Sequence, residues 1–121
     1  LAGSSQWFER GLVTYSNRAK QELLGVAESI IEKHGAVSRE TAESMALGLL
    51  KHAPVDWTVA VTGIAGPTGG SAEKPVGLVW IACAGLSTAA SAKTFEFQGD
   101  RESVRAQAAD AALRLLLEHL K

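Results

Sequence analysis

The sequence has little cysteine, no excess of either charge and no long apolar run. Cys83 is the single cysteine among 121 residues, which excludes an intrachain disulfide and a cysteine-based zinc site. Twelve Lys and Arg stand against thirteen Asp and Glu, so no basic excess favours binding to a nucleic-acid duplex. No apolar stretch approaches the ~18–20 residues that cross a bilayer, and no signal peptide is visible. We therefore expect neither a nucleic-acid partner nor a membrane.

The rest of the composition is that of an ordinary globular protein. Hydrophobic residues make up 46% and charged residues 21% of the chain, which excludes a disordered protein. The length is typical of one domain with its own core, and we expect a single domain over residues 1–121. Cys83 lies in an apolar run, where it is expected to pack as a small hydrophobic residue.

Four segments have the residue types of β-strands. They are residues 8–16, 57–65, 76–84 and, from Ser87 or Thr88, up to residue 98. The two middle segments are nearly continuous in apolar residues, which predicts strands buried on both faces and covered by helices. In the last segment, Phe95 and Phe97 fall on one face.

Three segments have helical periodicity. The first covers residues 17–33 with a break near Gly25, and the second covers residues 38–52 with Ser38 as the N-cap. The third starts with Asp100 as the N-cap and runs to Leu120. Its inner stripe is predicted to be Val104, Ala108, Ala111 and Leu115.

Helices that alternate with buried strands predict the α/β class, here a three-layer α/β/α sandwich with a mostly buried sheet. The apolar face of the last helix is widened by Leu116, Leu117 and Leu120. This width favours a homodimer or a higher homo-oligomer.

A glycine-rich segment, residues 63–77, lies between the two buried strands. Its glycines permit positive φ angles and close approach of a ligand, and successive N–H groups can form a nest for an anion. The candidate ligand-binding residues are Thr62, Gly63, Gly66, Thr68, Gly69, Gly70, Ser71 and Lys74. The segment has neither a Walker A motif nor a G-x-G-x-x-G dinucleotide motif. The alternative is a long connector without a ligand.

The second candidate site is the stretch TYSNRAK, residues 14–20, where a predicted strand ends and a helix begins. Ser16 or Asn17 can cap the helix, and Lys20 lies one turn further, on the same face as Ser16. A lysine that is partly desolvated at a cleft has a lowered pKa and can act as a base toward a hydroxyl nucleophile. The alternative for Lys20 is a solvated surface lysine.

Arg101, in the first turn of the last helix, is the third candidate. A cation there opposes the helix dipole, so helix stability does not explain it. It could hold a phosphate or carboxylate, or form a salt bridge with Glu102 or Glu96. The histidines show neither HxxxH nor HExxH spacing, so no metal site is predicted.

Taken together, four stretches closely resemble the C-terminal domain of the CinA family, which includes nicotinamide-nucleotide amidases. They are AGSSQWFERGLVTYSNRAKQELLGV, HGAVSRETAESMALG, VAVTGIAGPTGGSAEKPVG and FQGDRESVRAQAADAAL, in this order over nearly the whole chain. The resemblance implies a cytoplasmic, cofactor-free and metal-free hydrolase of the carboxamide of nicotinamide mononucleotide. It also implies a serine nucleophile and a lysine base.

Several residues match the motifs of that family. The lysine of its YSNxAK stretch corresponds to Lys20, the predicted catalytic base, and Tyr15 and Asn17 of the same stretch are predicted to bind substrate. The TGIAGPxGGS loop corresponds to residues 62–71 and is expected to hold part of the nucleotide, and Arg101, with Lys74 and Arg18 also available, is expected to bind its phosphate.

One departure concerns the nucleophile. In the family the serine lies in an ESCTGG-like segment upstream of AGSS, and that segment is absent from the sequence, which begins at Leu1. Ser44 lies in a similar TAES stretch but is followed by Met45 and no glycine pair, so the role is not assigned to it. We therefore expect a nucleophile upstream of this chain, and a fragment that binds better than it catalyses. The alternative is a non-catalytic nucleotide-binding or regulatory module of a larger CinA-type protein.

Overall fold

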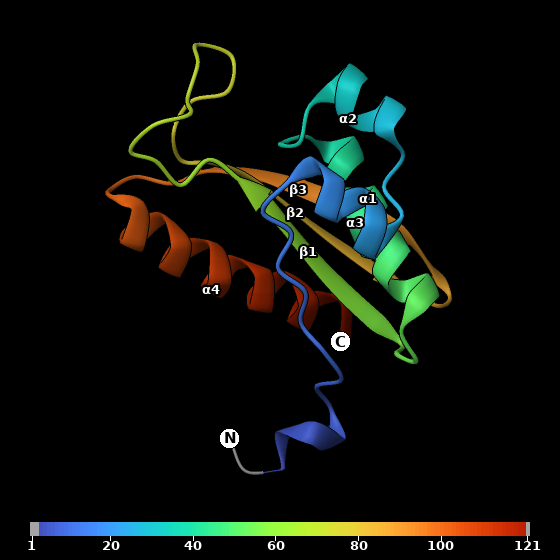
Figure 1. The fold of residues 1–121 in the computed structure, drawn as a ribbon. Coiled ribbons are helices and arrows are strands. Elements are labelled where there is room, and N and C mark those ends of the chain that lie inside the picture. Colours follow the sequence, from blue (N-terminus) through green and yellow to red (C-terminus); the bar gives the residue numbers. More distant parts are fainter. Residues whose placement is uncertain (1–2, 121) are drawn as a thin grey trace.

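An antiparallel sheet of three strands forms the centre of the computed structural model, which describes residues 3–120 (Figure 1). The strands are β1 (Trp57–Gly63), β2 (Leu78–Gly85) and β3 (Thr88–Glu96), in the order β1-β2-β3. In the register, Cys83 pairs with Val59 of β1 and with Ser91 of β3. The three strands are therefore consecutive along the chain and adjacent in the sheet.

Helices cover both faces of this sheet. On one face lie α1 (Asn17–Leu24), α2 (Glu28–His34) and α3 (Arg39–His52), and on the other lies α4 (Arg101–Leu120), as Figure 1 shows. A short 3-10 turn, η1 (Ser4–Gln6), precedes them. The predicted three-layer α/β/α sandwich is confirmed. No helix within residues 3–120 combines the length and apolar character needed to span a membrane.

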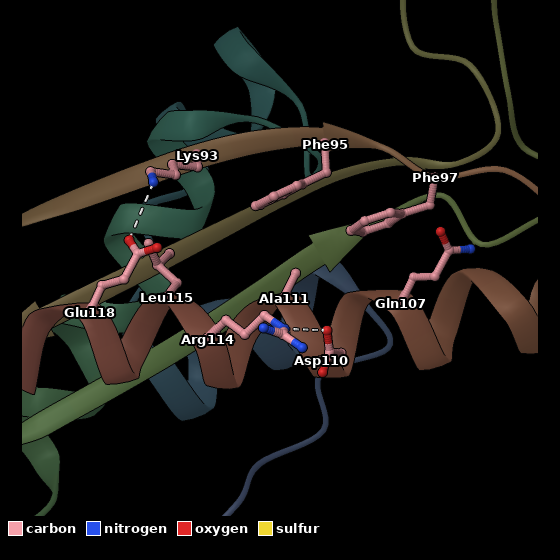
Figure 2. A pocket seen from close by; sticks show the side chains of 9 residues that line it. All are labelled: Lys93, Phe95, Phe97, Gln107, Asp110, Ala111, Arg114, Leu115 and Glu118. Carbon is pink, nitrogen blue, oxygen red and sulfur yellow. Dashed lines mark hydrogen bonds and ion pairs between the residues drawn. The ribbon is translucent and has the colours of Figure 1, made fainter.

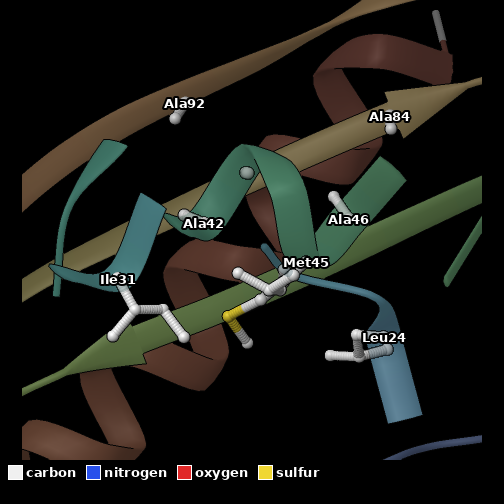
Figure 3. Close-up of a cluster of buried hydrophobic side chains, with 10 residues drawn as sticks. Leu24, Ile31, Ala42, Met45, Ala46, Ala84 and Ala92 are labelled. Atoms are coloured by element: carbon white, nitrogen blue, oxygen red, sulfur yellow. The ribbon is translucent and has the colours of Figure 1, made fainter. Parts of the chain in front are cut away.

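The core between α3 and the sheet is built largely from small side chains. Ala42 and Ala46 of α3 lie over strand residues such as Ala84 and Ala92, and Met45 fills the space beside them (Figure 3). Leu24, Val26, Ile31, Ala60 and Ala82 complete the buried cluster. Small residues at these positions bring the helix close to the sheet, so this layer packs tightly.

The core under α4 is formed by one face of β2 and the inner stripe of the helix. The buried members from the strand are Val79, Ile81 and Cys83, and those from the helix are Val104, Ala108, Ala112 and Leu115. The predicted stripe is confirmed at three positions, while Ala111 is half-buried and Ala112 takes the inner place.

Strand β2 is buried on both faces as predicted, but β1 is not. Thr58, Ala60 and Thr62 are buried toward α3, whereas Val61 is exposed. On the face toward α4 the prediction holds only in part, because Val59 packs against the core under α4 while Val61 stays exposed at this edge strand.

Residues 8–16 do not form the predicted strand. The segment has no regular secondary structure up to Tyr15 and no ladder partner among the described residues, and residues 8–13 are exposed. The residue types favour an extended backbone, whereas a strand also needs a partner for its N–H and C=O groups.

The helix boundaries follow the predicted caps. Gly25, with φ of 68°, ends α1 and separates it from α2. The side chain of Ser38 accepts from the N–H of Thr41 at 3.1 Å, and Asp100 Oδ1 accepts from the N–H of Ser103 at 2.9 Å. The predicted break near Gly25 and the predicted N-caps Ser38 and Asp100 are therefore confirmed.

Candidate active site

Lys20 is a buried lysine in the first turn of α1. The helix starts here because Ser16 is its N-cap, with Oγ accepting from the N–H of Ala19 at 2.9 Å. Only 7% of Lys20 is exposed, and its Nζ donates to the carbonyl oxygen of Thr14 at 2.7 Å. Burial lowers the pKa of Lys20 from its ordinary value of 10.5. The interpretation of Lys20 as a solvated surface lysine is wrong.

The two neighbours of Lys20 in the same motif are open to solvent. Tyr15 is 88% exposed, and Asn17, the first residue of α1, is also exposed. Both side chains are therefore free to meet a ligand that approaches the start of α1.

The glycine-rich loop between β1 and β2 extends beyond the end of the sheet at which α4 begins (Figure 1). Gly66 and Gly69 have φ angles of 84° and 97°, which disfavour any residue with a side chain. A Cβ at Gly70 would lie 2.7 Å from the backbone nitrogen of Val76. The N–H groups of Gly66, Gly69 and Gly70 donate to no acceptor in the described part of the chain. The loop therefore offers several unpaired N–H donors.

The start and the tip of this loop are fixed locally. At the start, Gly63 is close to β2, where a Cβ would lie 2.7 Å from Val79 Cγ2. The buried Thr62 donates through Oγ1 to the carbonyl oxygen of Ala36 at 2.8 Å. At the tip, Ser71 and Lys74 form a turn, because the N–H of Ser71 donates to Lys74 O at 2.8 Å and that of Lys74 to Ser71 Oγ at 3.0 Å.

Two of the three candidate cations, Arg101 and Lys74, contact backbone carbonyl groups, whereas the exposed Arg18 pairs with Glu22 at 2.6 Å. Arg101 Nη1 donates to Gly66 O at 3.0 Å, and Lys74 Nζ donates to His34 O at 2.7 Å. Within residues 3–120, Arg101 forms no salt bridge with Glu102 or Glu96, so that alternative is not supported. A guanidinium group has five N–H donors, which leaves most of the Arg101 head available to an anion.

The structure joins Arg101 to the loop and the loop to α2, but no hydrogen bond among the described residues joins Lys20 to the loop. The carbonyl groups of residues 34–36 are a feature that the sequence did not indicate. Gly35 O accepts from Ser38 Oγ at 3.0 Å and from Thr41 Oγ1 at 2.6 Å. The spacing G-x-x-S-x-x-T shows the two donor side chains, but it does not show that their acceptor is a backbone carbonyl group.

A hollow of about 350 Å³ lies elsewhere, between β3 and α4 (Figure 2). Phe95 and Phe97 stack with ring centroids 5.3 Å apart along it. Its charged side chains pair with one another, Arg114 with Asp110 at 2.7 Å and Lys93 with Glu118 at 3.5 Å. A second hollow, of about 450 Å³, lies between α1, α2 and α3. Neither contains a predicted site residue, so the candidate site remains the surroundings of Lys20 and the glycine-rich loop.

Residues with metal-binding side chains do not gather anywhere in this part of the chain. No three His, Cys, Asp or Glu side chains in residues 3–120 lie close enough together to hold a metal ion. The donors of the candidate site are instead an amine, backbone N–H groups and a guanidinium, which suit an anionic or carbonyl-containing ligand.

Comparison with known proteins defines the class of this domain. A solved competence/damage inducible protein of Agrobacterium tumefaciens superposes with a TM-score of 0.97 at 43% identity, covering 100% of this chain and 74% of that one. The fold is thus that of a group of bacterial α/β domains with solved structures. The model of the CinA C-terminal domain matches residues 1–120, and the chain belongs to this family.

Relatives of two kinds have similar sequences. The nicotinamide-nucleotide amidohydrolase PncC of Enterobacter agglomerans is 56% identical over 97% of this chain and 71% of its own length. A CinA-like protein of Geotalea daltonii is 53% identical over 99% of this chain but only 29% of its own length. The family therefore includes a protein named as an amidohydrolase and much longer proteins that contain the same domain.

Proposed function

We propose that this domain belongs to a cytoplasmic amidohydrolase that converts nicotinamide mononucleotide into nicotinate mononucleotide and ammonia. The observation that carries the proposal is the buried amine of Lys20, whose pKa is lowered by desolvation. A lysine base must be neutral to accept a proton, and a lowered pKa increases its neutral fraction near pH 7. The name of the similar PncC enzyme supplies the substrate.

The hydrogen bond of Lys20 suits a base. A neutral amine has two hydrogens and one lone pair, and donation to Thr14 O uses one hydrogen. The lone pair stays available to a hydroxyl group. In the proposed reaction a serine hydroxyl gives its proton to Lys20 Nζ while its oxygen bonds to the carboxamide carbon.

The remaining steps return the proton. The tetrahedral oxyanion collapses, the C–N bond breaks, and the ammonium of Lys20 protonates the leaving amine, which departs as ammonia. Water then attacks the acyl-serine and gives a proton to Lys20, and Lys20 returns this proton to the serine oxygen as the acyl C–O bond breaks. The product forms as a carboxylic acid, whose proton passes to the released ammonia to give carboxylate and ammonium, and no cofactor is consumed.

The loop and Arg101 are assigned to binding. The unpaired N–H groups of Gly66, Gly69 and Gly70 can donate to an oxyanion or to the phosphate of the nucleotide. Arg101 lies beside Gly66 and keeps further N–H donors for the phosphate. Tyr15, Asn17, Gly63 and Ser71 border these groups in the sequence motifs and complete the proposed substrate-binding set, whereas the buried Thr62 is assigned to anchoring the Ala36 carbonyl group.

The nucleophile is proposed to come from outside residues 1–121. The ESCTGG-like segment that bears the serine in the family occurs nowhere in this sequence, and the similar PncC enzyme has additional length beyond the matched region. Losing a nucleophile removes the covalent route, so the 121 residues alone are proposed to bind the nucleotide without turning it over.

Direct measurement of turnover tests the function. The protein as its gene encodes it is incubated with nicotinamide mononucleotide, and ammonia and nicotinate mononucleotide are quantified. We expect equal amounts of both products. Calorimetric binding of the nucleotide without any product would instead favour a non-catalytic nucleotide-binding module, the reading that the much longer CinA-like relative supports. If the protein neither binds nor hydrolyses the nucleotide, both proposals are contradicted.

We also propose that the domain forms a homodimer or higher homo-oligomer through α4. Leu113, Leu117 and Leu120 are each more than half exposed and lie on one side of the helix, and such a row is typical of a contact surface. Leu117→Lys is expected to lower the mass measured by sedimentation to that of the monomer, whereas Leu23→Lys on α1 leaves it unchanged. A monomeric wild type contradicts the proposal.

A further inference from the structure

Lys74 reaches out of the glycine-rich loop to a helix 40 positions earlier in the chain. Its Nζ donates to the carbonyl oxygen of His34, the last residue of α2, at 2.7 Å. The last carbonyls of a helix have no intrahelical partner and carry partial negative charge, so an ammonium is a favourable donor there. Lys74 is half-buried, unlike a freely solvated lysine.

Gly35 makes room for this contact. It has φ of 84°, and a Cβ at this position would lie 2.7 Å from Lys74 Nζ. A side chain would therefore both strain the backbone and displace the ammonium. The end of α2 is thus shaped to receive the amine of Lys74.

The carbonyl that receives Lys74 belongs to residues 34–36, a segment whose other two carbonyl groups are also hydrogen-bonded. Gly35 O is held by Ser38 Oγ and Thr41 Oγ1, both from the start of α3, and Thr41 is fully buried. Ala36 O is held by Thr62 Oγ1, near the point where β1 leads into the loop. Lys74 therefore joins the tip of the loop to a segment that is itself anchored to α3 and β1.

Arg101 holds the same loop from the other side of the sheet. It donates from the start of α4 to Gly66 O at 3.0 Å. The unpaired N–H groups of Gly69 and Gly70 lie in the sequence between these two attachment points, at Gly66 and Lys74.

We propose that Lys74 is a positioning residue, which holds the N–H groups of the glycine-rich loop in their ligand-binding geometry through its bond to the His34 carbonyl. The proposal replaces the expectation that Lys74 binds the phosphate directly, and it rests on the proposed nucleotide-binding function of the loop. Without the bond, the loop samples wider conformations, and the ligand must order it again on binding.

The test compares Lys74→Met with Lys33→Met in the protein as its gene encodes it. Lys33 is an exposed lysine in the last turn of α2, which makes it a matched control. Two properties are measured: amide hydrogen exchange of residues 66–73 in the ligand-free protein, and the kcat and KM for nicotinamide mononucleotide. Thermal melts establish that both variants fold.

For Lys74→Met we expect loop exchange to rise roughly tenfold or more, and KM to rise by a similar factor with kcat within about twofold of wild type. Lys33→Met is expected to change neither. A raised KM with unchanged loop exchange would mean that Lys74 contacts the ligand, and would overturn the proposal. An unchanged KM would also overturn the proposal, whether or not loop exchange rises.

The exchange measurement separates this proposal from the proposed function. If the wild-type protein does not hydrolyse the nucleotide, the proposed function is contradicted. The dissociation constant of the same nucleotide, measured by calorimetry, then replaces KM in the comparison of the variants. Unchanged loop exchange in Lys74→Met then still overturns the role of Lys74. If Lys74→Met does not fold, Lys74→Ala, which also removes the donor to the His34 carbonyl, is measured in the same way with the same expectations.

Discussion

The amine of Lys20 is removed from water, and this placement makes its proton easier to lose. The lowered pKa means that the folded protein releases this proton at a lower pH than the unfolded chain, whose lysine titrates near 10.5. Between these two pKa values the unfolded state binds more protons, so the free energy of unfolding rises with pH. Below the lowered pKa, the penalty for burying the charge is fully present.

The Lys20→Met variant should therefore lose this pH dependence of the free energy of unfolding. Urea unfolding is measured from pH 7 to pH 10.5 for both proteins. Because methionine does not titrate, wild type should gain stability relative to the variant as the pH rises. A constant difference between the two proteins across this range would show that the pKa of Lys20 is the same in both states.

Cys83 is also favoured in its neutral form by burial, but for a thiol this effect raises the pKa. It is 1% exposed, and burial together with the negative charge of Glu118 raises its pKa from 9.0 to about 11. Since the thiolate is the reactive form, a thiol-specific reagent at pH 8 should label the native protein at least a hundred times more slowly than the protein in denaturant, as roughly expected for a buried and protonated thiol. Equal labelling rates would contradict the placement of Cys83 in the core.

Residue chemistry at these positions was only partly predictable. The capping role of Ser16 and the small, buried character of Cys83 follow from local sequence and were confirmed. The burial of Lys20 was not predictable, because it depends on Thr14 O and the surrounding chain, and a lone lysine is usually solvated.

At the scale of elements, Ser38 at the start of α3 both stabilises the helix and fixes the segment that receives Lys74. Ser38 caps the helix at Thr41 and also donates to Gly35 O. Ser38→Ala should therefore lower the free energy of unfolding by about 1–2 kcal/mol. The matched Ser29→Ala, at an exposed position of α2, should change it by less than about 0.5 kcal/mol. Urea denaturation measures both, and equal effects would rule out the double role of Ser38.

The elements themselves were largely visible in the sequence. Periodicity gave α3 and α4, and the apolar runs gave β1 and β2, because local patterns follow directly from which face is buried. The strand predicted for residues 8–16 does not form, because a strand exists only with a partner. The residue types of this segment do not show whether a partner is available. The edge position of β1 was missed for the same reason.

At the scale of the whole molecule, the loop between β1 and β2 is placed by contacts from both layers. Lys74 bonds to α2 on one face of the sheet, and Arg101 bonds from α4 on the other. The sequence indicated a ligand-binding loop and three candidate cations, but not that Arg101 and Lys74 contact backbone carbonyls 35 and 40 positions away. Such long-range acceptors carry no side-chain identity, so only the folded structure reveals them.

The central claim is that the desolvated amine of Lys20 is the base of an amide hydrolysis. The most direct measurement is ammonia release from nicotinamide mononucleotide by the gene-encoded protein and its Lys20→Met variant, with Lys51→Met as the control for loss of a lysine. Circular dichroism establishes that the variants fold. We expect Lys20→Met to lower kcat about a hundredfold or more, as typical for loss of a general base, while Lys51→Met stays near wild type. Wild-type turnover in a folded Lys20→Met protein would contradict it.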